Sequence, residues 1–146
     1  MAESATRTTT VQAPARSIMD VIADIESYPE WTGQVGSAQI LDRHPSSGRP
    51  ATVRFALRSG IISDEYTVAY TWDADRSVRW TLIEGKVLKE MDGSYVLRPL
   101  SAGATEVTYE LSVDLSIPMI GAMKRRAAKM VIDIALNGLR GRVEDD

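Results

Sequence analysis

The fold is decided by the last long segment of the chain, residues 117–143, which reads IPMIGAMKRRAAKMVIDIALNGLRGRV. Polar residues recur in it every three or four positions and form one stripe: Arg126, Lys129, Asp133, Asn137 and Arg140. A second stripe at the same spacing is apolar or small: Ile120, Met123, Ala127, Val131, Ile134 and Gly138. This pattern predicts an amphipathic helix of six or seven turns whose second stripe is buried. We expect Ser116 to cap its start and Pro118 to lie in its first turn.

Most of the chain before this helix alternates apolar and polar residues, which predicts β-strands. We expect strands at residues 6–11, 35–42, 52–57, 62–72, 78–82, 87–98 and 105–113, with the face of residues 35–42 undecided. Two short helices follow the first strand, the first of them opened by Ala13-Pro14. Pro29 disfavours helix at Tyr28, so we expect residues 28–31 to form a compact aromatic corner. The short connections predict an antiparallel meander. Because only one long helix can cover the sheet, we expect an α+β fold in which six to seven curved strands surround the C-terminal helix.

Composition limits the classes of function. A chain of 146 residues with 44% hydrophobic and 25% charged residues predicts one globular domain over residues 1–146. The absence of cysteine excludes thiolate metal sites and suits the cytoplasm, where we expect the protein. A lone histidine, His44, argues against a multi-histidine metal site, so we expect no metal or cofactor. We also expect no signal peptide, no membrane span and, at a net charge of −3, no DNA binding.

Four motifs carry a family resemblance: DIESYPEW at residues 24–31, GSYVL at 93–97, TEVTYEL at 105–111 and IPMIG at 117–121. In this order and spacing they resemble the START-like helix-grip (SRPBCC) superfamily, in its branch of polyketide cyclase/dehydrase and lipid transport proteins. The chain is similar to the coenzyme-Q-binding START proteins of that branch. The resemblance implies an apolar cavity between the curved sheet and the long helix. Its expected ligand-binding residues are Trp31, near an entrance, and Phe55, Tyr66, Val68, Trp80, Leu82, Met91, Tyr95, Met119, Met123, Ala127, Val131 and Ile134.

The same residues also fit a plain packed core, because inward aromatic residues and methionines on a helix face usually pack. The small residues and flexible methionines of the long helix favour a cavity instead. We therefore expect binding or transport of a small hydrophobic ligand, such as a lipid, an isoprenoid or a polyketide-like molecule.

Two alternatives use other residues. Glu84, Asp64 and Tyr66 fall on the inward phase of their strands, and a buried carboxylate beside a tyrosine could serve a cyclase or dehydratase as general acid or base. The simpler interpretation places both carboxylates in water at strand ends. Lys124, Arg125, Arg126 and Lys129 could contact ribosomal RNA or a membrane surface, although a solvated helix face explains them as well.

Overall fold

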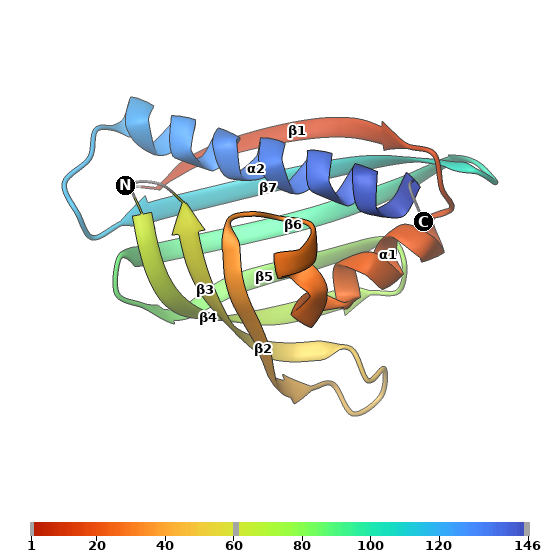
Figure 1. Ribbon diagram of the computed structural model, residues 1–146, viewed down its shortest axis with the longest axis horizontal. Coiled ribbons are helices and arrows are strands. Elements are labelled where there is room, and N and C mark those ends of the chain that lie inside the picture. The colour runs from red at the N-terminus through yellow and green to blue at the C-terminus, as the bar shows by residue number, and fades with distance from the viewer. Residues whose placement is uncertain (1, 60–61, 145–146) are drawn as a thin grey trace.

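A seven-stranded antiparallel sheet curves around one long C-terminal helix in the computed structural model, which describes residues 2–59 and 62–144 (Figure 1). The elements in chain order are β1 (Glu3–Val11), α1 (Ala15–Ala23), the 3-10 helix η1 (Ile25–Glu30), β2 (Val35–Arg43), β3 (Pro50–Ser59), β4 (Ile62–Asp73), β5 (Ser77–Gly85), β6 (Leu88–Ser101), β7 (Ala104–Leu115) and α2 (Gly121–Glu144). The strands lie in the order β1-β7-β6-β5-β4-β3-β2, so the first strand pairs with the last. This arrangement confirms the predicted α+β helix-grip fold.

The apolar and polar residues that alternate in the sequence lie on opposite faces of the sheet. In β7, the buried residues Val107, Tyr109, Leu111 and Val113 alternate with less buried neighbours. Strand β2 is the exception that the sequence left undecided. Its pairing with β3 is irregular at three places, between Val35 and Ser37 and on both sides of Asp42. Each irregularity disturbs the period of two, which is why no single phase fits this strand.

Helix α2 corrects two sequence predictions. It begins at Gly121, so Pro118 precedes it, and the Ser116 hydroxyl donates to the carbonyls of Lys86 and Val87 at 3.0 and 3.1 Å instead of capping the helix. Its buried face is also turned by about one residue from the predicted stripe. The buried residues are Lys124, Ala128, Ile132, Ala135, Leu136, Leu139 and Val143.

The predicted apolar stripe therefore lies partly in solvent. Ile120, Met123 and Ile134 are 67%, 47% and 38% exposed. The cause is the run of paired apolar residues along the helix, such as Val131-Ile132, which offers two overlapping apolar faces at the same spacing. The sheet contacts the face that carries the larger residues.

Ion pairs join α2 to the strands beneath it. Arg7 of β1 contacts Asp133 at 3.0 Å, but both side chains are well exposed, so this pair adds little stability. Lys124 is different, since its Nζ lies 2.6 Å from Oδ1 of Asp114 on β7 and the two side chains are only 11% and 5% exposed. The hydrogen bond from Lys124 is the main reason that the pKa of Asp114 falls to about 2. This pair fixes the N-terminal end of α2 to the sheet.

The C-terminal half of α2 covers a solid core. Helix α1 lies beneath this end (Figure 1), and its Ile18, Met19 and Ile22 are fully buried. Leu136 and Leu139 of α2 are as completely buried, at 1% and 0% exposure. The residues beneath the N-terminal half pack differently.

Candidate functional site

A cavity of about 100 Å³ lies between the concave face of the sheet and the N-terminal part of α2, which lines it as far as Ala135. Its walls come from the η1–β2 segment, from strands β3 to β7 and from the small residues Ala127, Ala128 and Ala135 of α2. Small side chains on α2 leave this space because the aromatic residues of the sheet do not reach the helix backbone. The gap beneath the helix is therefore not filled.

Two aromatic clusters form most of the wall. In the first, the ring centroid of Tyr28 lies 4.9 Å from that of Trp31 and 6.0 Å from that of Phe55, and Tyr66 continues the cluster 5.5 Å beyond Phe55. In the second, Trp80 lies at the centre, with its ring centroid 5.8, 5.5 and 5.5 Å from those of Tyr70, Tyr95 and Tyr109. The cavity thus offers flat aromatic faces and edges to a ligand.

Gly93 makes the second cluster possible. It lies opposite Trp80 across the β5–β6 pair, and the Trp80 indole covers the place where a side chain would project. A Cβ atom at this position would overlap the indole ring. The motif GSYVL therefore needs its glycine for close packing of an aromatic ring, not for a turn.

Most polar side-chain atoms of the cavity wall have no hydrogen-bond partner among the residues that the structure describes. Tyr28 donates to the carbonyl of Ile22, whereas the hydroxyls of Tyr66, Tyr70, Tyr95 and Tyr109 have no protein partner among the residues that the structure describes. The indole Nε1 of Trp31 and the amide Nε2 of Gln34 are buried and also unpaired within that part of the chain. Desolvation by burial raises the pKa of all five tyrosines, which keeps these hydroxyls neutral.

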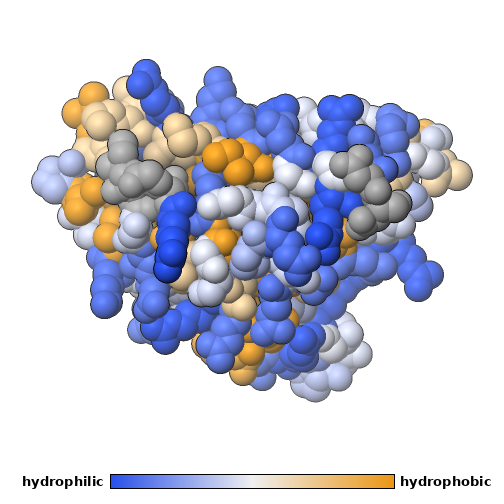
Figure 2. Space-filling model, viewed as in Figure 1, coloured by the Kyte–Doolittle hydropathy of each residue, from blue (hydrophilic) through white to orange (hydrophobic). Residues whose placement is uncertain are grey.

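The cavity opens between η1–β2 and α2. The lining residues that are only half-buried lie there: Trp31, Val35, Ala127 and Val131. Figure 2 shows small apolar patches over α2 and just beneath it, set in a mostly hydrophilic surface. Gly138 lets the chain approach closely at this side, because a Cβ atom there would overlap the carbonyl oxygen of Trp31. Trp31 therefore lies at the edge of the opening.

The structure brings most of the predicted ligand residues together around this cavity. Those that line it are Trp31, Phe55, Tyr66, Trp80, Met91, Tyr95, Ala127 and Val131. The others do not line it. Val68 is fully buried within the packed core, Leu82 and Met119 are half-buried at its margin, and Met123 and Ile134 lie on the exposed side of α2 because the helix is turned.

Sequence reasoning missed several lining residues. Tyr109 and Leu111 alternate with polar residues in the TEVTYEL motif, and Tyr28 lies in the DIESYPEW motif, so their phase or motif could have identified them. Thr32 and Gln34 carry no such signal, because they lie between η1 and β2, where no period applies.

The carboxylates of the enzyme alternative lie elsewhere. The Asp64 carboxylate is buried, but it accepts the backbone N–H groups of Lys86, Val87 and Leu88 at 3.1, 3.1 and 2.9 Å and so holds the β5–β6 turn. Glu84 is exposed. The pairing of β4 with β5 skips Ile83, since Val68 faces Leu82 and Thr67 faces Glu84, and this bulge moves Glu84 to the outer face. Of the three proposed groups, only Tyr66 lines the cavity.

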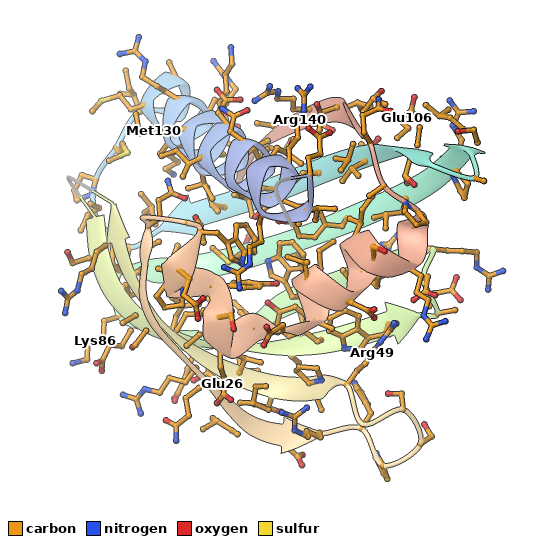
Figure 3. All side chains as sticks on the ribbon, turned by 45° about the vertical axis from the view of Figure 1, so that its right-hand side comes forward. Glu26, Arg49, Lys86, Glu106, Met130 and Arg140 are labelled. Carbon is orange, nitrogen blue, oxygen red and sulfur yellow. The ribbon has the colours of Figure 1, made fainter. Side chains whose placement is uncertain are left out.

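The predicted basic cluster is also divided. Lys124 is buried against Asp114, which removes it from the surface. Arg125, Arg126 and Lys129 remain exposed on α2, and Arg125 pairs with Glu3. Figure 3 shows the outer side of the same helix, where Met130 and Arg140 point away from the sheet.

Within residues 2–59 and 62–144, no three His, Asp or Glu side chains come together in a way that could hold a metal ion. None of the helices in these residues combines the length and the apolar character needed to span a membrane.

Comparison with known proteins agrees with this geometry. The family model "Polyketide cyclase / dehydrase and lipid transport" matches residues 11–140. A START superfamily protein from Mycobacterium smegmatis superposes with a TM-score of 0.90 at 25% identity, covering 97% of each chain. The Zhui aromatase/cyclase from Streptomyces sp. R1128 superposes with a TM-score of 0.82 at 18% identity, covering 99% of this chain and 94% of its own.

Sequence comparison adds distant relatives of another kind. The ribosome association toxin RatA of Pseudomonas aeruginosa is 24% identical over 124 residues, which are 82% of this chain and 83% of the toxin. The persistence and stress-resistance toxin PasT of Escherichia coli O6:H1 is 24% identical over 130 residues, which are 86% of this chain and 80% of that protein.

Proposed function

The chain belongs to the polyketide cyclase / dehydrase and lipid transport family, and from this premise we propose that it binds or carries a small, mostly apolar molecule without transforming it. The observation that supports this most is the cavity beneath α2, whose wall consists of aromatic, aliphatic and a few neutral polar side chains. No carboxylate, histidine or lysine belongs to the described wall, and burial raises the pKa of its five tyrosines away from neutrality. A binder needs a shaped apolar space, whereas an acid–base enzyme needs a group beside its substrate that exchanges a proton near neutral pH.

The proposed binding energy comes mainly from apolar burial. Removing roughly 200 Å² of apolar ligand surface from water, at about 25 cal/mol per Å², gives about 5 kcal/mol before the cost of association. Stacking against the aromatic clusters adds to this figure. About 5 kcal/mol corresponds to a dissociation constant of roughly 0.2 mM, so we expect weak binding that lets a carrier release its ligand.

The test is to look for a ligand and then to block its space. Purified protein is extracted with solvent, and native mass spectrometry with a panel of lipids, isoprenoids and polyketide-like phenols identifies what binds. Ala127→Trp places an indole at the opening of the cavity and should abolish binding. Ala122→Trp adds the same side chain at an exposed position of α2 outside the cavity wall and should bind as the unmodified chain does.

A failure to recover any ligand, together with an unchanged thermal midpoint across the whole panel, would contradict the proposal. Binding that survives in Ala127→Trp would place the ligand elsewhere on the molecule.

A second function, ribosome association, is favoured by the name of one distant relative, the ribosome association toxin RatA of Pseudomonas aeruginosa. The exposed cations Arg125, Arg126 and Lys129 are the groups available for phosphate contact on α2. The net charge of −3 opposes this function. Co-sedimentation with ribosomes should then weaken steeply with salt and fall further in Arg126→Glu/Lys129→Glu, and an absence of co-sedimentation at low salt would dismiss it.

A further inference from the structure

The outer side of helix α2 carries an apolar stripe that consists of Ile120, Met123, Ala127, Met130 and Ile134. Its four large members are exposed, Ile120 by 67% and Met130 by 50%, and Figure 3 shows Met130 pointing away from the sheet. The part of the chain that the structure describes exposes nine large apolar side chains, and these four lie on one side of one helix. Such clustering indicates a surface that another molecule covers.

The spacing of the stripe is that of a coiled coil. Successive members are separated by three, four, three and four residues, which is a period of 3.5. Ile120 directly precedes α2, and its carbonyl accepts the N–H of Lys124 at 3.2 Å, so it continues the helical spacing. A stripe with this period stays on one side of the helix and forms a seam that a second helix can cover.

Two charged residues beside the stripe indicate which helix that is. Arg126 and Asp133 lie seven residues apart and therefore on the same flank of the stripe. When two copies of one helix pack antiparallel around a two-fold axis, the same flanks face each other. An axis between Ala127 and Met130 brings each Arg126 opposite Asp133 of the other copy. The outer side of α2 is thus complementary to itself in shape and in charge.

Both charged side chains are available for this contact. Arg126 is exposed and has no ion pair within residues 2–59 and 62–144. Arg7 contacts Asp133 through Oδ1, and the Asp133 side chain is still 41% exposed. An anionic membrane fits this surface less well, because the net charge of −3 gives no overall attraction and Asp133 repels lipid phosphate.

We infer that the partner of this stripe is a second copy of the chain, packed through an antiparallel contact between the two α2 helices. Five positions per copy make a short seam, so the dimer is weak and forms reversibly with concentration. Ala127 belongs both to the stripe and to the opening of the cavity, so the second copy lies beside the route by which a ligand enters.

Sedimentation velocity of the full chain over a wide range of concentrations measures the dimer directly. Met130→Glu places an unpaired charge near the two-fold axis in both copies and should raise the dissociation constant by about tenfold or more. Leu100→Glu is the matched control, because Leu100 of β6 is exposed to a similar degree, at 48%, outside the stripe. It should change the dissociation constant by less than about twofold.

Charge exchange tests the orientation of the two helices. Arg126→Asp and Asp133→Arg should each weaken the dimer by about fivefold, because each variant brings like charges together at two places. The double variant Arg126→Asp/Asp133→Arg restores opposite charges and should recover most of this loss. Asp133→Arg and the double variant both lack the contact with Arg7, so that contact does not explain a recovery.

Three results would overturn the inference. The first is a chain that stays monomeric at every concentration, and the second is a dimer that Met130→Glu leaves unchanged. The third is a double variant that dimerises no more tightly than the single variants, which would exclude the antiparallel register. A monomer that floats with phosphatidylcholine vesicles containing phosphatidylglycerol would assign the stripe to a lipid surface instead.

Discussion

The two halves of helix α2 cover different interiors. Its C-terminal half packs Leu136 and Leu139 onto α1, whose Ile18, Met19 and Ile22 have no exposed surface. Its N-terminal half presents alanines to an aromatic wall and leaves a cavity. One helix therefore serves both as part of the core and as the roof of a candidate binding site.

The difference shows how a small protein can keep an empty space. A cavity costs free energy because its lining atoms lack partners. Here the packed core beneath the C-terminal half of α2 and the continuous sheet supply stability. The buried Lys124–Asp114 pair holds the N-terminal half of α2 in place over the cavity. The hollow half can then be shaped for a ligand.

The largest expected effect lies in the solid half. Leu139→Ala should lower the free energy of unfolding by about 3 kcal/mol, because it opens a new void in a fully packed region. Val131→Ala, in the wall of the existing cavity, should cost about 1 kcal/mol or less, since its neighbours already lack close contacts on one side. Urea denaturation of both variants measures the difference, and equal costs would contradict the division of the interior.

The close packing within the aromatic wall should have the next largest effect. Gly93→Ala forces the Trp80 indole away from its place over β6, and overpacking of this kind costs about 2 kcal/mol. Near-ultraviolet circular dichroism should change together with the unfolding free energy. Gly103→Ala, where a new Cβ meets no atom within 4 Å, is the control and should leave the tryptophan signal unaltered.

Low pH should weaken the attachment of α2 to the sheet. Asp114 has a pKa lowered from 3.8 to about 2, chiefly by the hydrogen bond from Lys124, so the folded state favours its ionised form. The resulting stability is complete above about pH 4 and is lost as the pH falls toward 2. In Asp114→Asn the thermal midpoint should start lower and fall less over this range, and parallel curves for the two proteins would refute the assignment.

The smallest effects distinguish the tyrosines. Tyr28→Phe leaves the Ile22 carbonyl without its side-chain donor and should cost about 1 kcal/mol. Tyr95→Phe removes a hydroxyl that has no partner among the described residues, so the unfolding free energy should change by less than about 0.5 kcal/mol. A large loss in Tyr95→Phe would reveal a structural role for that hydroxyl and weaken its assignment to a ligand.

The sequence predicted the fold well, because seven alternating strands with short connections and a single long helix can pack together in only a few ways. It predicted the sheet side of the cavity better than the helix side. Tyr66, Trp80 and Tyr95 follow a strict period of two, so their direction was fixed by their strands. Met123 and Ile134 were assigned to the cavity because the apolar residues of α2 cover two overlapping faces, and spacing alone does not choose between them.

Other features depend on contacts between distant residues. Glu84 lost its inward position through a bulge at Ile83, which no local pattern reveals. The sequence analysis grouped Lys124 with its exposed basic neighbours, but its ion pair with Asp114 places the side chain in the buried space between α2 and the sheet. Gln34 lies in a connection without periodicity and enters the wall only through the tertiary fold.

The central claim, that a small, mostly apolar ligand occupies the hollow half alone, is tested most directly by methyl nuclear magnetic resonance. The chain is labelled at its alanine, valine, leucine and isoleucine methyl groups and titrated with a panel compound that binds in native mass spectrometry. We predict that the signals of Ala127, Ala128, Val131 and Ala135 shift in a saturable manner, while those of Ile18, Leu139 and Val143 stay in place. Shifts confined to the second group, or no saturable shift in the first, would contradict the account.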